Sequence, residues 1–210
     1  MKQHKFIADG MLGKLTRWLR LLGHNIEYAG SMDDKELIQK ARNENRVLLT
    51  RDVELYKQAI AKGAEAFLIE SPNQTANLAS LAKRFKFKLE VNVKTSRCPK
   101  CNGTIKTASK TSVADKIPPT TSSNYNEFWQ CQQCGQVYWR GAHWNRIEKI
   151  LDEAKKTQAT ARLPVKASVF GTSKELLKRM REHRRCRSRK QDQKICEKNA
   201  EQETQSLQLK

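Results

Sequence analysis

The sequence predicts an α/β protein with a parallel sheet covered by helices on both faces, followed by a small cysteine module and a basic tail. Short apolar runs alternate with helix-period segments over residues 5–91, a pattern typical of such sheets. Two Cys-x₂-Cys pairs then predict the module, and a concentration of Lys and Arg predicts the tail. We expect three parts, at 1–92, 93–154 and 155–210.

Each element of the first part follows from its periodicity. Strands are expected at 5–8, 25–28, 47–49 and 66–69, and a further one at 87–91. Helices are expected at 11–22, at about 53–62 and at about 74–85, and another after Ser31 or Asp33 with Leu37, Ile38 and Ala41 on one face. Gly23 stands where a left-handed cap would end the first helix, and Ser31 and Asp33 are candidate N-caps of the second. A closing helix is expected at 142–154.

Charge is the strongest feature of the composition. The 210 residues include 41 Lys and Arg against 22 Asp and Glu, a formal net charge of +19, and residues 155–210 hold 16 basic and 6 acidic side chains. Such a surplus predicts a polyanionic partner, with nucleic acid as the first candidate and a merely solvated surface as the alternative. The tail is expected to be disordered or to fold on a partner. No apolar run approaches the length of about 18 residues that a membrane span needs, and the N-terminus lacks the pattern of a signal peptide, so we expect a cytoplasmic protein without a membrane partner.

Acidic residues stand where the predicted strands end. Asp9 follows the first strand, Asp52 follows the third, and Asp33 and Asp34 begin the helix between them. In a parallel sheet these positions share the carboxyl edge, where such folds bind ligands. Crowded carboxylates suit Mg²⁺ or Mn²⁺, which activate water and stabilise charge on a phosphate during strand cleavage. The alternative is that each Asp is only a cap or a turn former.

The four paired cysteines predict a zinc site. Cys98 and Cys101 form one pair, and Cys131 and Cys134 form the other. Two such pairs can close a tetrahedral Zn²⁺ site with no open position, so the zinc is expected to be structural. Gly103 and Gly135 follow the pairs, where a tight backbone favours glycine. Cys186 and Cys196 have no partner motif, and we interpret them as free thiols, with a second metal site including His183 as the alternative.

Several segments together resemble a known family. Residues 6–23 (FIADGMLGKLTRWLRLLG), 33–38 (DDKELI) and 46–52 (RVLLTRD) resemble motifs of the Mut-seven C-terminal RNase domain, a branch of the PIN-like nucleases. Residues 97–103 (RCPKCNG), 128–135 (FWQCQQCG) and 138–144 (YWRGAHW) look like its zinc-ribbon half. The resemblance covers residues 5–150 in the family's order. It implies a PIN-like three-layer sandwich with a zinc ribbon.

The resemblance also implies an activity and the residues that perform it. It implies a metal-dependent ribonuclease in which Asp9, Asp34 and Asp52 bind Mg²⁺ or Mn²⁺, with Asp33 as the fourth acid. Glu54 stands where related nucleases often have a second acid. A nuclease acting on DNA, a PIN-type toxin, and a non-catalytic protein that binds RNA or the ribosome remain as alternatives.

Basic and aromatic side chains are the candidates for contacting RNA. We expect phosphate contacts, which are salt-dependent and carry little sequence information. The aromatic residues of the module could stack on bases, although packing within so small a module is the favoured interpretation, and His143 is interpreted as structural. The predicted RNA-binding residues are Arg17, Arg20, Arg51, Arg140, Arg184 and Arg185.

Overall fold

A four-stranded parallel sheet forms the centre of the first part, as the sequence predicts. The structure is a computed structural model that describes residues 4–160. The strand order is β2-β1-β3-β4, and β1 pairs with both β2 and β3. The strands are β1 (Lys5–Asp9), β2 (Asn25–Ala29), β3 (Val47–Thr50) and β4 (Ala66–Leu68).

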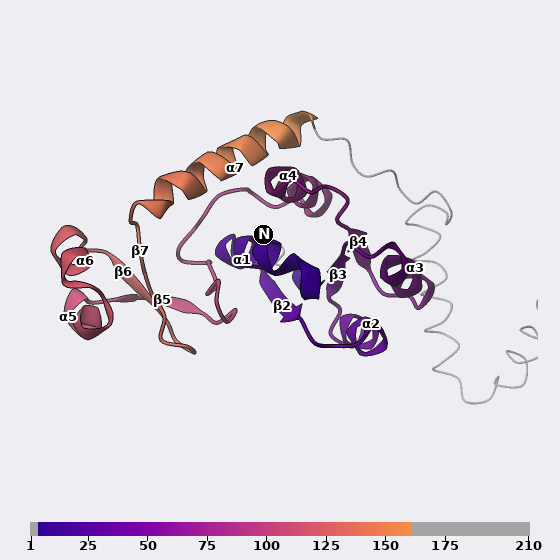
Figure 1. Cartoon of the computed structure of the whole chain (residues 1–210), viewed down its shortest axis with the longest axis horizontal. Helices are drawn as coiled ribbons and strands as arrows, with labels where there is room; N and C mark the ends of the chain where they lie inside the picture. The colour runs from indigo at the N-terminus through magenta and orange to yellow at the C-terminus, as the bar shows by residue number, and fades with distance from the viewer. Residues whose placement is uncertain (1–3, 161–210) are drawn as a thin grey trace, which may run out of the picture. The chain divides into compact units, whose positions relative to one another are not determined.

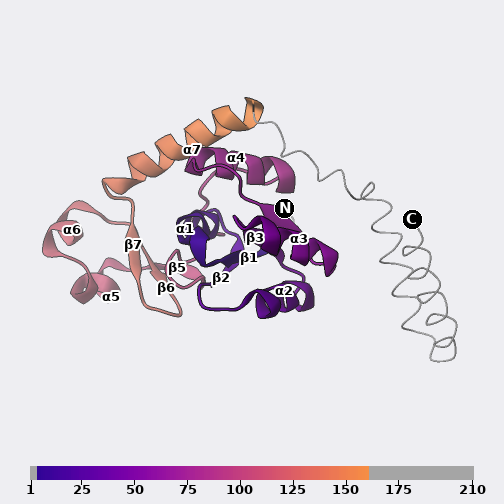
Figure 2. The ribbon, with the colours of Figure 1, turned by 45° about the vertical axis from the view of Figure 1, so that its right-hand side comes forward.

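Helices cover both faces of this sheet because successive strand residues point to opposite sides. Phe6 and Ala8 of β1 enter a core shared with α1 and α4, whereas Ile7 enters a second core shared with α2 and α3. Figures 1 and 2 show the resulting three layers, with α4 on one side of the sheet and α2 on the other. The helices are α1 (Gly13–Leu21), α2 (Asp34–Asn43), α3 (Val53–Ala61) and α4 (Gln74–Phe85), and the short 3₁₀ helix η1 (Gly10–Leu12) precedes α1.

Gly23 ends α1 as the sequence predicts. Its φ is +93°, its N–H donates to Arg20 O at 2.9 Å, and the N–H of His24 donates to Leu19 O at 2.9 Å. These two bonds form a Schellman cap, which requires a left-handed residue. A Cβ at Gly23 would also approach Thr95 O to 2.9 Å. A larger residue here would therefore displace the segment around Thr95, which leads to the two cysteine pairs.

The expected strand at 87–91 is absent from the sheet. Phe87 and Leu89 are buried in the core on the α4 side, but the segment pairs with no strand. Alternating apolar residues therefore mark an irregular segment whose apolar side chains are buried in the core on the α4 side. This pattern cannot be told from a strand by periodicity alone.

The second part is a small antiparallel sheet with its own core. It contains β5 (Ile105–Ala108), β6 (Phe128–Cys131) and β7 (Val137–Trp139) in that order. The insertion between β5 and β6 folds into α5 (Lys110–Val113), η2 (Ala114–Lys116) and α6 (Pro119–Asn124). Its core consists of Val113, Ile117, Phe128 and Val137.

The closing helix α7 (His143–Thr160) returns the chain to the first part. Leu151 and Ala154 are buried in the same core as α4, and Figures 1 and 2 both show α7 alongside α4. Among the helices within residues 4–160, none combines the length and the hydropathy needed to cross a membrane. The expected tail, with Arg184, Arg185, Cys186 and Cys196, lies outside the described residues.

His24 predicts a dependence of stability on pH. Its side chain is buried, neither ring nitrogen has a hydrogen-bond partner, and its ring lies 4.3 Å from that of Phe87. Burial, with a smaller contribution from His4, lowers the pKa of His24 from 6.5 to about 4. Because the unfolded chain binds this proton more readily, stability is complete above pH 6.5 and falls as the pH drops toward 4, by about 3 kcal/mol at most.

The measurement is urea unfolding of the wild type and of His24→Leu at pH 7 and pH 4.5. The wild type should lose more stability than the variant over this range. Acid also protonates the four paired thiols in both proteins, so the difference between the two is the quantity that reports on His24. Equal losses would show that His24 does not titrate in this way.

Candidate functional site

Asp9 is a buried carboxylate held by the ends of two neighbouring strands. It is the last residue of β1 and only 8% exposed. Its Oδ1 accepts a hydrogen bond from the N–H of Met11 at 2.9 Å. Its Oδ2 accepts from the Thr50 hydroxyl at the end of β3 and from the N–H of Arg51 at 3.3 Å. Three donors therefore stabilise a buried negative charge at the carboxyl edge of the sheet.

Asp52 is tied to the same Thr50. Its N–H donates to Thr50 Oγ1 at 2.9 Å, so this one hydroxyl contacts both acidic residues. The carboxylate is exposed, and its Oδ1 caps α3 by accepting from the N–H groups of Glu54 and Leu55 at 2.7 and 3.0 Å. Within residues 4–160, no donor forms a hydrogen bond with Oδ2. Glu54 itself is exposed and pairs with Lys57 at 2.8 Å.

Asp33 and Asp34 differ in what their side chains do. Asp33 is the N-cap of α2, and its Oδ1 accepts from the N–H of Glu36 at 2.8 Å. Asp34 is the first residue of α2 and is exposed, and within residues 4–160 its carboxylate has no hydrogen-bond or ion-pair partner. Capping therefore accounts for Asp33 and leaves Asp34 without a structural role.

The acids share one edge but are not gathered as tightly as the cysteines. Asp9, Asp34 and Asp52 follow β1, β2 and β3, which are neighbours in the sheet. Within residues 4–160, the four paired cysteines are the one group of three or more metal-ligating side chains close enough to surround a single ion. The structure thus brings Asp9 and Asp52 together through Thr50 and leaves Asp34 apart at the start of α2.

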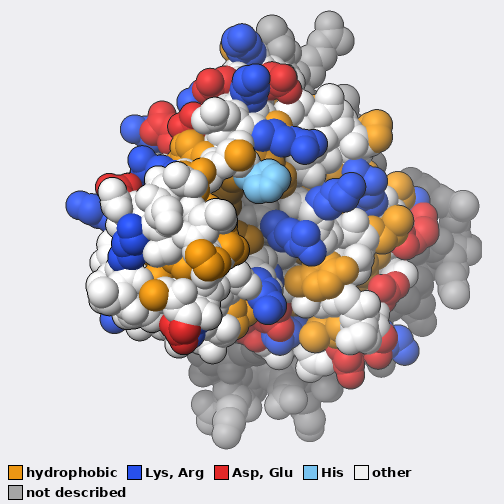
Figure 3. All heavy atoms as spheres, turned by 60° about the vertical axis from the view of Figure 1, so that its left-hand side comes forward, with side chains coloured by type: hydrophobic (Ala, Val, Ile, Leu, Met, Phe, Trp, Pro, Cys, Tyr) orange, Lys and Arg blue, Asp and Glu red, His pale blue; other side chains and the backbone are white. Residues whose placement is uncertain are grey.

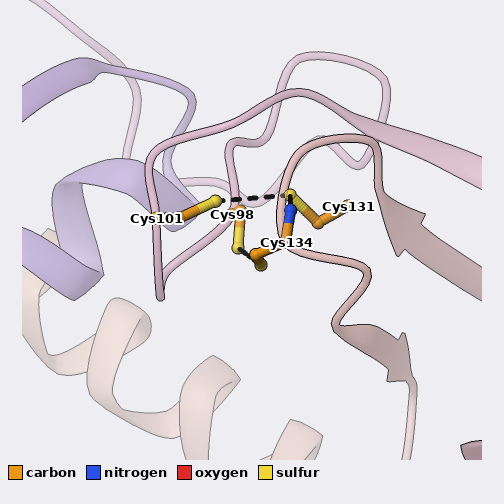
Figure 4. A group of neighbouring side chains, drawn as sticks. All are labelled: Cys98, Cys101, Cys131 and Cys134. Atoms are coloured by element: carbon orange, nitrogen blue, oxygen red, sulfur yellow. Dashed lines mark hydrogen bonds between the residues drawn. The ribbon is translucent and has the colours of Figure 1, made fainter.

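The four cysteines meet where the two pairs face each other. Figure 4 shows their side chains converging from the loop before β5 and from the β6–β7 turn. Cys98 and Cys134 have sulfurs 3.6 Å apart, Cys101 and Cys131 have sulfurs 3.4 Å apart, and all four lie within 4.8 Å of one another. Four sulfurs about 2.3 Å from a tetrahedral Zn²⁺ stand about 3.8 Å apart. These thiols could therefore hold a metal ion such as zinc.

The surroundings of Cys98 Sγ favour its ionised form. The Tyr138 hydroxyl lies 3.0 Å from Cys98 Sγ. Burial raises the pKa of Cys98, but the hydrogen bonds from Tyr138 and from the N–H groups of Lys100 and Cys101 outweigh it and bring the pKa to about 7. The N–H groups of Gln133 and Cys134 point to Cys131 Sγ at 3.4 and 3.5 Å. Such donors are typical of the surroundings of metal thiolates.

Glycine is required in the two turns for different reasons. Gly135 has a φ of +71°. In the first turn the left-handed residue is Asn102, with a φ of +70°, whereas a Cβ at Gly103 would approach Cys131 Sγ to 3.0 Å. The sequence prediction of tight turns is therefore right for Gly135, and at Gly103 the reason is close approach to the sulfur cluster.

Comparison with known proteins identifies the chain. The family model of the Mut7-C RNAse domain matches residues 4–151, which include the acidic edge and all four paired cysteines. The chain belongs to this family. Membership indicates a nuclease-type function, and it confirms the resemblance that the motifs predict.

Two further comparisons accompany this family match. No curated protein matches the chain. A solved domain of a functionally unknown protein from Methanocaldococcus jannaschii DSM 2661 is 19% identical, over 34% of this chain and 76% of that one, with a TM-score of 0.23. So low a TM-score does not establish a common fold.

Arg20 of this Mut7-C chain is a structural residue instead of the RNA contact that we expected. It is buried, and its guanidinium donates to Ile26 O of β2 and to the carbonyls of Pro99 and Lys100, each at 3.1 Å. Burial lowers the pKa of Arg20, while the nearby Cys101 and Cys98 raise it. The side chain therefore joins the first cysteine turn (residues 98–101) to the α/β domain, and its N–H groups donate to carbonyl oxygens of the protein.

The other predicted RNA-binding arginines lie at the surface where they are described. Arg17 is exposed and has no hydrogen-bond or ion-pair partner within residues 4–160. Arg51 is exposed and donates to Ser71 O at 3.1 Å. Arg140 is exposed and lies over the rings of Trp129 and Trp144, at 5.7 and 4.9 Å.

The aromatic residues of the ribbon serve more than one purpose. Trp139 packs against the ribbon core, as the packing interpretation predicts. Trp144 donates to Glu148 at 2.7 Å and, with Trp129, flanks Arg140. Exposed His143 begins α7.

Sequence reasoning missed three residues that organise the site. Thr50 joins Asp9 to Asp52, Tyr138 contacts Cys98, and Asn102 accepts from the N–H of Ile26 at 3.2 Å while donating to Asn25 at 2.9 Å. Thr50 and Asn102 lie inside segments that carry the resemblance, so a polar residue next to a ligand was the available signal. Tyr138 also lies inside such a segment, but its contact with Cys98 depends on how the two turns face each other, which no local pattern contains.

Proposed function

We propose that this chain is a metal-dependent ribonuclease whose active site is the carboxyl edge of the parallel sheet. The observation that carries the proposal is the buried carboxylate of Asp9, fixed by Thr50 and the N–H of Arg51 beside Asp52. Burying a carboxylate costs free energy, and capping η1 through the N–H of Met11 does not require the further bonds from Thr50 and Arg51. Membership of the Mut7-C RNAse domain family supports the same conclusion.

The donor set fits a hard divalent cation. Asp9, Asp34 and Asp52 offer carboxylate oxygens, which Mg²⁺ and Mn²⁺ prefer. Mg²⁺ keeps several waters and needs only one or two direct carboxylates together with substrate phosphate, so Asp9 and Asp52 suffice as the direct pair and Asp34 can act through water. When bound, such an ion supplies an activated water and stabilises charge on the phosphate.

The chain's own residues position this chemistry. Thr50 holds the orientation of Asp9 and, through the N–H of Asp52, the distance between the two acids. Asp52 caps α3 through Oδ1, and within residues 4–160 its Oδ2 accepts no hydrogen bond. Arg17 and Arg51 are exposed cations on the elements that follow β1 and β3, where they attract the phosphates of RNA. Asp33 contributes by starting α2 and so placing Asp34.

The zinc ribbon completes the proposal as a structural part. Four thiols fill all positions of a tetrahedral Zn²⁺, which leaves none for substrate. The ion would therefore contribute folding free energy and hold the ribbon against α1 through Arg20. The basic residues 155–210 are proposed to hold RNA, free or in the ribosome, by phosphate contacts.

RNA cleavage tests this proposal. The full chain should cut labelled single-stranded or structured RNA with Mg²⁺ or Mn²⁺ and should not cut without added divalent ion. Asp9→Asn/Asp52→Asn should lower the rate at least about a thousandfold while RNA binding persists, because phosphate contacts lie elsewhere. Asp115→Asn, an exposed acid of the ribbon insertion, is the matched control.

Two outcomes would contradict the nuclease. Binding with a steep salt dependence but no cleavage under any metal would favour the non-catalytic RNA- or ribosome-binding protein. Cleavage that survives in the double variant would move the active site away from this edge. Single-stranded DNA as a parallel substrate separates a ribonuclease from a DNA nuclease.

A further inference from the structure

A cleft lies between α1, the end of β2 and the first cysteine turn. Its volume is about 410 Å³, within the range of small-ligand sites. Figure 3, which looks onto the ribbon side of the molecule, shows Lys and Arg side chains gathered around a hollow. The polar side chains that line the cleft are Thr16, Arg17, Arg20, Tyr28, Lys100, Gln136 and Tyr138.

The charged side chains that line this cleft are all positive, and the nearby thiols of Cys98 and Cys101 face Arg20. None of the described residues that line it is acidic. Arg17 and Lys100 are exposed, and neither has a carboxylate partner within residues 4–160. Arg17 also repels Arg20, whose charge is directed to the carbonyls of Pro99 and Lys100. Two free cations facing one cleft without a counter-charge favour an anionic ligand.

Tyr28 gives the cleft an aromatic face. Its hydroxyl donates to Gly10 O at 2.7 Å, and its ring lies so close to Gly30 that a Cβ there would approach it to 3.0 Å. The ring is thus supported on one side by glycine backbone, yet the residue is 43% exposed. An aromatic ring fixed in this way can stack on an unpaired base.

The floor and the far wall of the cleft are also polar. Thr16 is buried, and among the described residues its hydroxyl has no hydrogen-bond partner. Tyr138 forms part of the opposite wall, where its hydroxyl contacts Cys98 Sγ. The lining of the cleft therefore includes two exposed cations, an aromatic ring and a buried hydroxyl, and its Tyr28 contacts Gly10, the residue after Asp9.

We infer that this cleft binds one nucleotide of a single-stranded RNA, with its phosphate held by Arg17 and Lys100 and its base stacked on Tyr28. The inference rests on the proposed function for the choice of RNA. It adds a substrate subsite that the acidic edge alone does not provide. Because Tyr28 contacts the residue next to Asp9, a strand held here leads directly to the proposed active site. The first cysteine turn supplies one wall, so the metal-bound ribbon takes part in substrate binding.

The test measures equilibrium binding of a fluorescein-labelled, unstructured RNA to the full chain in an Asp9→Asn/Asp52→Asn background, which prevents cleavage. Arg17→Ala/Lys100→Ala should weaken binding at least about tenfold and lower the salt slope by about 0.7, since the two cations hold one phosphate and each neutralised single-strand phosphate contributes about 0.7. Lys62→Ala/Lys106→Ala removes the same charge from exposed positions outside the cleft, and it should weaken binding by less than about threefold. Equal losses in the two double variants would overturn the subsite.

Tyr28 separates stacking from simple charge attraction. Tyr28→Ala should weaken the binding of single-stranded RNA at least about fivefold and leave the binding of duplex RNA unchanged, because paired bases cannot reach the ring. Tyr28→Phe keeps the ring and should keep the affinity. A loss in Tyr28→Phe as large as in Tyr28→Ala, or an equal loss for duplex RNA, would refute stacking.

A chemical footprint of the unsubstituted protein avoids any effect of a substitution on folding. Bound RNA should slow acetylation of Lys100 but not of Lys62, and equal rates would overturn the inference. The outcome is separable from that of the nuclease proposal. Protection of Lys100 without cleavage would retain the subsite and reject the nuclease, whereas cleavage without protection would do the reverse.

Discussion

Cys131→Ser is expected to remove the metal from the ribbon and to unfold that part of the chain. Structural zinc sites contribute on the order of 10 kcal/mol to folding, more than the small core of Val113, Ile117, Phe128 and Val137 can replace. The loss should reach the α/β domain, because Arg20 would lose the ordered carbonyls of Pro99 and Lys100. Bound zinc by elemental analysis and hydrogen exchange of β5, β6 and β7 measure the effect.

Cys186→Ser and Cys196→Ser are the matched controls, since the sequence places neither in a paired motif. Both should retain zinc and the protection of the ribbon. Zinc retained in Cys131→Ser would contradict a four-thiolate site. Zinc lost in either control would bring the tail cysteines into metal binding, as in the alternative that includes His183.

Asp34→Asn is expected to lower RNA cleavage at least about a hundredfold, and Asp33→Asn by less than about threefold. Asp33 caps α2 through the N–H of Glu36, and asparagine caps a helix equally well. Asp34 has no such partner within the described part of the chain, so its carboxylate is free to act on the ion. Initial cleavage rates and thermal unfolding of the two variants give the comparison.

This pair of variants differs by one position on one helix, so effects on folding and on net charge are matched. The reverse order of rates would assign the metal-binding role to Asp33. Full activity in both variants would remove the start of α2 from the active site and leave Asp9 and Asp52 as its acids.

The sheet was predictable because its signals are local. Apolar runs, Gly23 and the Asp33 cap each act within a few residues, and they fix the strands and helices to within a residue or two. The prediction of a strand at 87–91 was wrong because a pattern of burial does not say which element covers the residues. Here Phe87 and Leu89 are buried in the core on the α4 side without any strand pairing. Periodicity reports burial and leaves the partner open.

The candidate site was predictable in its residue types and not in its contacts. Asp9 and Asp52 can be placed at one edge from the sequence because the carboxyl ends of parallel strands meet at the same edge of a sheet. The role of Thr50 needs the register between β1 and β3, which no local pattern contains. Arg20 was misassigned because an arginine on an amphipathic helix gives no sign that a distant turn will cover it.

Binding of Mn²⁺ to the zinc-loaded full chain tests the central claim, that acids at the sheet edge hold a divalent ion. Titration followed by electron paramagnetic resonance should show a site that is lost in Asp9→Asn/Asp52→Asn and kept in Asp115→Asn, with zinc content unchanged in all three proteins. Thr50→Val should weaken it, since the hydroxyl positions both acids. No Mn²⁺ binding by the wild type, or equal binding by the double variant, would contradict the account.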